Sequence, residues 1–146
     1  MAAYRSGGSY AVQRIAHAAP SAVIYCDAGH GGWLGWKSNM KDYVATIRSL
    51  NVSSHLRGFA TNVAGYQALG VMCPTYDFCL NNAHPEHACC VDPCGLIEQW
   101  NPSQNEHNYA LHLREAMSEG IPSFMPHVII DTGRNGVADE RQRCSN

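Results

Sequence analysis

The residues best suited to chemistry lie in one ten-residue stretch, residues 27–36, with the sequence DAGHGGWLGW. It holds a carboxylate (Asp27), an imidazole (His30) and two indoles (Trp33 and Trp36) among four glycines. Indoles suit sugar rings, because they offer flat apolar faces with a polar N–H at the edge, and the C–H faces of sugars are apolar. The stretch therefore predicts a site that binds sugar rings beside a charged group.

Each of these side chains also has a purely structural interpretation. Asp27 would cap the turn that follows it, a common use of aspartate in loops. A loop histidine such as His30 is more often a hydrogen-bonding group than a ligand, and tryptophan is largely buried on average. The structural interpretation is weaker for Trp33 and Trp36, since both lie in a glycine-rich loop rather than on a periodic stripe. We favour a functional site, in which Trp33 matters more than Trp36.

Polar residues also follow two other predicted strands. Asn62 comes directly after residues 56–61, and Asp131 ends residues 126–131. Because α/β folds bind ligands at the carboxyl ends of their parallel strands, Asn62 is a candidate substrate-binding residue. Its alternative role is to satisfy backbone groups at the end of the strand.

The seven cysteines are concentrated in one segment. Their density favours disulfide bonds formed in an oxidising compartment. The same segment contains His84 and His87 and so has enough soft ligands for zinc, but its spacing differs from the close ligand pairs of a regular zinc finger. We predict disulfides, no metal and no cofactor, with Cys26 as a buried free thiol in its strand. The five clustered cysteines are Cys73, Cys79, Cys89, Cys90 and Cys94.

The segments that must position these residues alternate between helix and strand. Apolar spacing predicts an amphipathic helix at residues 10–19, ended by proline, with Val12, Ile15, Ala16 and Ala19 on its apolar face. A second helix is predicted to be capped by Asn39. A capping box formed by Ser103 and Glu106 predicts the start of a third helix. Its apolar stripe should consist of Tyr109, Leu113, Ala116 and Met117. Strands are predicted at residues 22–26, as a buried apolar run, and at residues 56–61 and 126–131.

This order predicts an α/β fold with a parallel sheet built from βα units, since right-handed crossovers join parallel strands through helices. Three strands are too few to close a barrel, which commonly needs about eight. Both edges of the sheet should therefore be exposed, which favours aggregation. Residues 63–103 form an unusually long irregular connection, which we expect the cysteines to cross-link.

Composition excludes several classes of partner. The chain has 146 residues, of which 45% are hydrophobic, enough for one globular core. Its formal net charge is −2 and it has no basic run, so we expect no nucleic-acid partner. We found no apolar run of membrane-spanning length and no apolar segment typical of a signal peptide, so we expect no membrane partner.

Three motifs, in order along the chain, resemble the core of a known family. DAGHGGWLGW follows the VIY strand, RGFATNVAGY occupies residues 57–66, and IIDTGRNG occupies residues 129–136. Together they resemble glycoside hydrolase family 6, the inverting cellulases that include cellobiohydrolases and endoglucanases. The resemblance implies that residues 1–146 are an incomplete portion of a distorted α/β barrel, with a cysteine-rich insertion at about residues 73–100. It also implies an extracellular protein.

The resemblance implies roles for the candidate site residues. Asp27 would supply a fixed negative charge that favours an oxocarbenium-like transition state and raises the pKa of a nearby general acid. His30 would hydrogen-bond a sugar hydroxyl, and Trp33 and Trp36 would stack on glucosyl units on the leaving-group side. Arg134 fits a surface charge equally well from sequence alone, and by resemblance orients the carboxylate taken as the candidate base.

The chain departs from the family pattern at one position. The family's substrate-binding asparagine falls three residues after Asn62, where this chain has Gly65. This difference removes a hydrogen-bond donor from the neighbouring subsite.

The reaction implied by the family is hydrolysis of β-1,4-glucosidic bonds with inversion, which needs a general acid and a base. The strands that carry them in the family would lie before Tyr10 and after the end of this sequence, so we expect the isolated chain to be inactive. Alternatives are a non-catalytic glucan-binding remnant and, less favoured, a zinc-stabilised interaction module. The expected partner is a β-1,4-glucan or cello-oligosaccharide, and we expect a monomer.

Overall fold

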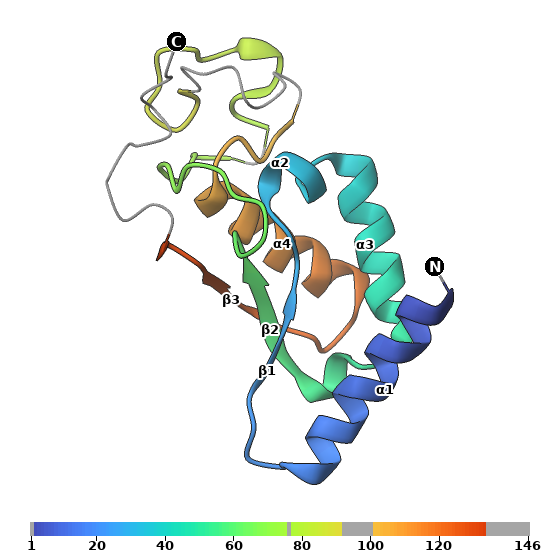
Figure 1. The fold of residues 1–146 in the computed structure, drawn as a ribbon. Helices are drawn as coiled ribbons and strands as arrows, with labels where there is room; N and C mark the ends of the chain where they lie inside the picture. The colour runs from blue at the N-terminus through green and yellow to red at the C-terminus, as the bar shows by residue number, and fades with distance from the viewer. Residues whose placement is uncertain (1, 76, 92–100, 134–146) are drawn as a thin grey trace.

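The computed structural model describes residues 2–75, 77–91 and 101–133. Its three strands form one sheet in the order β1-β2-β3, and both neighbouring pairs are parallel. The loops after the strands therefore gather at one edge of the sheet, the upper edge in Figure 1. The predicted α/β fold with a parallel sheet is confirmed. The strands are β1 (Ile24–Asp27), β2 (Leu56–Thr61) and β3 (His127–Ile130).

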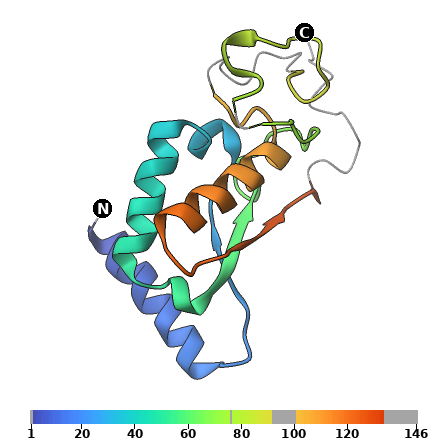
Figure 2. The ribbon, with the colours of Figure 1, turned by 180° about the vertical axis from the view of Figure 1, so that it is seen from behind.

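Four helices accompany the sheet within the described residues: α1 (Ala2–Ala18), α2 (Gly31–Leu34), α3 (Lys37–Leu50) and α4 (Glu106–Gly120). Helix α4 crosses one face of the sheet, behind the strands in Figure 1 and in front of them in Figure 2, and α3 packs beside it. Two short 3-10 turns, η1 (Ser53–His55) and η2 (Leu80–Asn82), lie in the connections. None of the described helices combines the length and apolar character needed to cross a bilayer.

The core lies between the sheet and helices α3 and α4. Phe59 of β2 is fully buried, and its ring makes edge contacts with Tyr43 and Phe124 at centroid distances of 5.9 and 6.0 Å. Helix α4 adds Tyr109, Leu113 and Met117, which lie four residues apart and so share one face. This stripe is the one that the apolar spacing predicts, and it fixes α4 against the sheet.

The predictions for the first helix and strand are partly wrong. Helix α1 begins at Ala2 rather than near Tyr10, and Ile15, predicted on its buried face, is 47% exposed. Strand β1 is half-buried rather than buried, and Val23 just before it is 65% exposed. The reason for the exposure of β1 is visible in Figure 1, where the strands face the viewer without a described helix in front of them.

The predicted caps of two helices are also wrong. Asn39 lies inside α3, where its Nδ2 donates to the Trp33 carbonyl at 2.8 Å. Helix α4 is capped by Asn105, whose Oδ1 accepts from the Asn108 amide at 3.0 Å. Ser103 lies too far before the helix to cap it and has a fully buried side chain. Serine and asparagine are both good caps, so composition alone could not choose between them.

Candidate functional site

Residues 27–36 lie at the upper edge of the sheet, where β1 ends and the short helix α2 follows. We call this segment the glycine-tryptophan turn. Trp33 is 67% exposed, whereas Trp36 is half-buried and donates from its indole nitrogen to the Gly32 carbonyl at 3.3 Å. The turn therefore presents the Trp33 indole to solvent and ties Trp36 to its own backbone.

Asp27 is exposed at the end of β1 and caps the turn after it. Its Oδ1 accepts from the Gly29 amide at 2.8 Å, and its backbone carbonyl accepts from the Tyr43 hydroxyl at 3.1 Å. Asp131, after β3, makes the matching bond to the Gly133 amide at 2.7 Å. The turn-capping role considered for Asp27 is thus present, and its carboxylate remains accessible at the sheet edge.

His30 is half-buried and lies over Gly65 from the loop after β2. A Cβ at Gly65 would lie 2.8 Å from both Cδ2 and Nε2 of the His30 ring. A larger residue at position 65 would therefore have to displace the imidazole. The glycine that departs from the family pattern is the residue that makes room for His30.

Asn62 serves the backbone in this structure. It is 1% exposed, and its Oδ1 accepts from the Gln67 amide at 2.9 Å. Its Nδ2 donates to the carbonyls of Gln67 and Asp131 at 3.3 and 3.2 Å. Asn62 therefore joins the loops that follow β2 and β3, which favours the structural alternative. Arg134, the other candidate from this edge, lies outside the described residues.

A set of polar side chains beneath the turn was not predicted, and we call it the buried polar layer. Asn101 donates from Nδ2 to the Gly31 carbonyl at 3.0 Å, and Glu106 accepts from the Gly31 amide through Oε2 at 3.2 Å. The same Oε2 accepts from Gln67 Nε2 at 2.8 Å. The backbone N–H and the backbone carbonyl of Gly31 are therefore both hydrogen-bonded to buried side chains. The layer consists of Gln67, Asn101, Ser103 and Glu106, none more than 2% exposed.

Two glycines of the turn are required by this packing. A Cβ at Gly31 would collide with Gln67 Nε2 and lie 2.8 Å from the Ser103 carbonyl, and one at Gly35 would collide with the Ser103 side chain. The Ser103 hydroxyl also donates to the Gly35 carbonyl at 3.4 Å. The spacing of the glycines, four residues apart at the start of a helical turn, is the sequence signal that could have indicated a tightly covered face.

Two tyrosines anchor the end of β1 from the helices behind it. Tyr109 of α4, fully buried, donates its hydroxyl to the Ala28 carbonyl, and Tyr43 of α3 donates to the next carbonyl back. Burial raises the pKa of both phenols, so they stay protonated and remain donors. The position of Asp27 is therefore fixed by α3 and α4.

Two further groups near the turn have shifted pKa values. Burial raises the pKa of the Glu106 carboxyl, an effect that the nearby Thr61 hydroxyl and the hydrogen bonds from Gly31 and Gln67 oppose. Burial also raises the pKa of Cys26, a free and half-buried thiol in β1. Cys26 therefore stays neutral at pH 7, which excludes it as a thiolate nucleophile.

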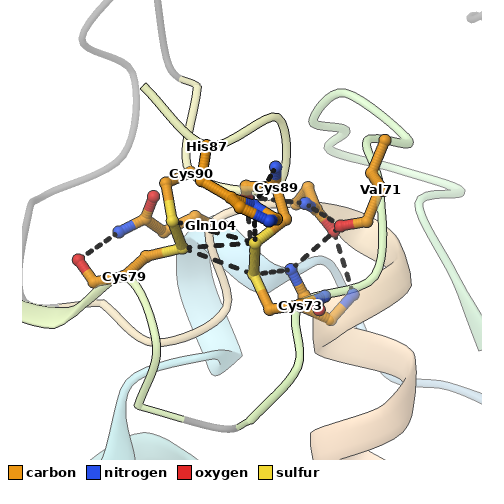
Figure 3. Close-up of a disulfide and its surroundings, with 9 residues drawn as sticks. Val71, Cys73, Cys79, His87, Cys89, Cys90 and Gln104 are labelled. Atoms are coloured by element: carbon orange, nitrogen blue, oxygen red, sulfur yellow. Dashed lines mark hydrogen bonds between the residues drawn. A yellow bond between two sulfur atoms is a disulfide. The ribbon is translucent and has the colours of Figure 1, made fainter. Parts of the chain in front are cut away.

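The cysteine-rich loop contains two adjacent disulfides, Cys73–Cys89 and Cys79–Cys90, as Figure 3 shows. The predicted disulfides are thus confirmed, while Cys94 lies outside the described residues. The four sulfur atoms lie within 4.8 Å of one another. Such a set could hold a zinc ion only as free thiolates.

The disulfide-bonded loop is docked on the start of α4. Gln104 donates from Nε2 to the Cys79 carbonyl at 3.1 Å, as Figure 3 shows, and Asn105 donates to the Cys89 carbonyl at 3.1 Å. Asn108 accepts from the Cys73 amide at 2.8 Å. Since Glu106 lies between these residues, the loop and the buried polar layer share one short segment of chain.

The histidines of this loop are packed with its other side chains. The ring of Phe78 stacks on His84 at a centroid distance of 4.1 Å and meets His87 edge-on at 4.8 Å. His87 Nδ1 also lies 3.2 Å from Cys89 Sγ. Both histidines are exposed, so they cover Phe78 and the Cys89 sulfur from the solvent side of the loop.

The sequence of this chain matches a known protein family and individual relatives. Residues 1–145 match the model of the family described as "Glycosyl hydrolases family 6". The chain is 33% identical to 1,4-beta-D-glucan cellobiohydrolase CEL6C of Podospora anserina over 150 residues, which is 99% of this chain and 32% of the relative. The chain thus spans about a third of the length of such relatives.

Solved structures agree with the match. The catalytic domain of Cellulomonas fimi Cel6B superposes with a TM-score of 0.67 at 25% identity, over 88% of this chain and 29% of that one. Cellobiohydrolase II (Cel6A) from Humicola insolens, in complex with glucose and cellotetraose, superposes with a TM-score of 0.60 at 27% identity. This match covers 90% of this chain and 31% of that one. The three-stranded sheet therefore corresponds to part of a larger catalytic domain in these proteins.

Proposed function

The chain belongs to glycosyl hydrolase family 6. From this premise we propose that it forms part of the glucan-binding surface of a secreted β-1,4-glucanase. The observation that carries the proposal is the position of Trp33, whose indole is 67% exposed at the same sheet edge as the Asp27 carboxylate. An exposed indole on a turn held from beneath is suited to stacking on a sugar ring. The partner would be a β-1,4-glucan or cello-oligosaccharide, in keeping with the cellotetraose complex of the Humicola insolens enzyme.

Each side chain of the turn has a proposed role. Trp33 stacks on a glucosyl unit on the leaving-group side, and Trp36 adds a weaker contact because its indole is half-buried and bonded to Gly32. His30 donates to a sugar hydroxyl. Asp27 supplies a fixed negative charge beside the scissile bond, which favours a positively charged transition state. Asn62 organises the adjacent loops and contributes indirectly.

We further propose that these 146 residues bind sugar without hydrolysing it. Inversion needs a general acid and a general base about 6.5–9.5 Å apart on opposite faces of the sugar. Asp27 and Asp131 each use one carboxylate oxygen, Oδ1, to cap their own turns, and we propose neither of them as the general acid or the general base. The chain would then act as a catalyst only together with further parts of a family 6 domain. A glucan-binding protein without catalysis is the second candidate, and the same Trp33 geometry supports it.

Titration with cellotetraose, followed by tryptophan fluorescence, tests the binding proposal. We expect saturable quenching in the wild type, and a loss of affinity of about tenfold or more in Trp33→Ala, because the stacking face is removed. Trp36→Ala should weaken binding less. Tyr10→Ala is a matched control, since Tyr10 is 66% exposed but lies on α1. Equal affinity of the wild type and Trp33→Ala would contradict the proposal.

A reducing-sugar assay on the same oligosaccharide tests the catalytic part. We expect no release above buffer from the purified chain. Release that disappears in Asp27→Ala would show that the chain hydrolyses glucan by itself. That result would show that catalysis does not require further parts of a family 6 domain.

A further inference from the structure

Glu106 is a fully buried carboxyl group beneath the glycine-tryptophan turn. It is the first residue of α4, and its Oε2 accepts from the Gly31 amide at 3.2 Å and from Gln67 Nε2 at 2.8 Å. No lysine or arginine within the described ranges forms an ion pair with it. A buried carboxylate without a cation is costly, so the neutral form is favoured at this position.

The second oxygen of the same carboxyl group indicates where a proton would go. Glu106 Oε1, Thr61 Oγ1 and Gln67 Oε1 are all buried, and none of them makes a hydrogen bond of ordinary geometry within residues 2–75, 77–91 and 101–133, although the Thr61 hydroxyl is near enough to lower the pKa of Glu106. The glutamine oxygen can only accept, and the threonine hydroxyl carries a single hydrogen. The Thr61 hydroxyl can supply one donor to these oxygen atoms, and a proton on Oε1 would supply a second. Each unpaired buried oxygen that gains a donor stabilises the arrangement.

We propose that Glu106 is a positioning residue for the glycine-tryptophan turn and acts in its protonated form, with Oε2 holding the Gly31 amide and Oε1 donating to Thr61 or Gln67. By holding Gly31, Glu106 also positions His30, one residue before Gly31, and Trp33, two residues after it. The proposal rests on the proposed function insofar as the turn binds sugar. Its consequence is that the position of Trp33 depends on the proton of Glu106.

The surroundings of Glu106 are consistent with a retained proton. Burial raises its pKa, and the hydrogen bonds to it and the nearby His107 lower that pKa without supplying a buried cation. Strand β2 and the adjoining loops present uncharged groups, from Thr61, Gln67 and Ser103. The titratable groups that interact with it are His107 and Tyr109 on its own helix, and the charge of Asp27 on the turn acts on Tyr109 as well.

The glutamine variant provides a sharp test, because its amide imitates the protonated carboxyl. In Glu106→Gln the amide oxygen can accept from Gly31 while the amide nitrogen donates to Thr61 or Gln67. We expect the affinity of the wild type for cellotetraose, measured by tryptophan fluorescence from about pH 4 to 8, to fall about fivefold as Glu106 ionises. Glu106→Gln should keep the low-pH affinity, apart from changes with pH that both proteins share. Glu115→Gln, an exposed acid on the same helix, should follow the wild type.

A second measurement separates this proposal from the proposed function. The ¹⁹F resonance of 5-fluorotryptophan at Trp33, assigned with Trp33→Phe, reports the turn without any sugar. We expect it to show a transition in the wild type with a midpoint above pH 4.5, the ordinary carboxyl pKa, and we expect Glu106→Gln to lack that transition. A purely structural glutamate would leave the same pH profile in both proteins, and that result would overturn the proposal.

The two proposals can then fail separately. If no protein binds cellotetraose at any pH but the fluorine shift titrates only in the wild type, the sugar-binding function fails and the role of Glu106 stands. If Glu106→Gln does not fold, the wild-type fluorine titration decides alone. Absence of a carboxyl titration at Trp33 in the wild type contradicts the positioning role.

Discussion

At the scale of single residues, polar side chains around the turn divide into an outward and an inward group. Asp27 and Trp33 face solvent, whereas Asn101 and Glu106 are almost fully buried and bind the Gly31 peptide. Substitutions of the outward group should therefore change binding with little effect on stability, as exposed positions usually do. Substitutions of the inward group should change stability first, because they leave buried backbone groups unpaired.

The buried His112 of α4 gives a prediction on stability and pH. Burial lowers its pKa from 6.5 to about 3, the charge of Asp77 raises it, and that of Lys37 lowers it. Between these pH values the unfolded chain binds a proton that the folded chain does not, so acidification favours unfolding. We expect the free energy of unfolding to fall by up to about 1.4 kcal/mol per pH unit between pH 6.5 and about pH 3.

His112→Asn isolates this contribution, because asparagine does not titrate and can keep a hydrogen bond to the Ser103 hydroxyl, which lies 2.9 Å from His112 Nδ1. Urea denaturation of both proteins at several pH values measures the difference. The difference in unfolding free energy between the wild type and His112→Asn should decrease steadily below pH 6.5, since the other titrating groups are common to the two proteins. A difference that stays constant with pH would show that His112 titrates normally in the folded state.

At the scale of elements, apolar periodicity in the sequence predicted the strands and the buried face of α4. The three strands follow apolar runs, and the stripe of α4 follows from Tyr109, Leu113 and Met117 at four-residue spacing. Periodicity could not reveal the buried polar layer, because Asn101 looks like a residue of an exposed loop and Glu106 like the acidic residue of a capping box. Their burial depends on contacts with Gly31, which is distant in sequence, and such contacts override local propensity.

The cysteine-rich loop gives a prediction at the same scale. The Cys73–Cys89 bond closes a separation of 16 residues, and Cys79–Cys90 closes 11. By loop entropy, each contributes about 3 kcal/mol, with slightly more for the longer loop. We expect the double variant Cys73→Ser and Cys89→Ser to lose about that much unfolding free energy in non-reducing denaturation.

A reducing control tests the cause of that loss. With a phosphine reductant present, the wild type and the double variant should unfold at nearly the same denaturant concentration, because neither retains a cross-link. Gln104 and Asn105 join this loop to α4, so loss of the bond should also speed hydrogen exchange at the Gly31 amide. Unchanged exchange there would mean that the loop and the turn are independent.

At the scale of the whole molecule, the sheet exposes apolar surface beside an edge. Within the part of the chain that the structure describes, β1 and β3 are the outer strands. Ile129 of β3 is 48% exposed, and Met125 just before the strand is 64% exposed. An edge strand with exposed apolar side chains pairs readily with another chain. The relatives are about three times as long and so have more chain with which to cover these positions.

This surface predicts association that depends on concentration and on β3. We expect the chain to be monomeric when dilute and to form larger species at high concentration, with edge pairing through β3 as the cause. Ile129→Lys should keep the mass measured by light scattering near 16.0 kDa, because a lysine on an edge strand opposes pairing. Ile15→Lys is the matched control, since Ile15 is 47% exposed but lies on α1. If both lysine variants reduce association equally, general hydrophobicity rather than the β3 edge is responsible.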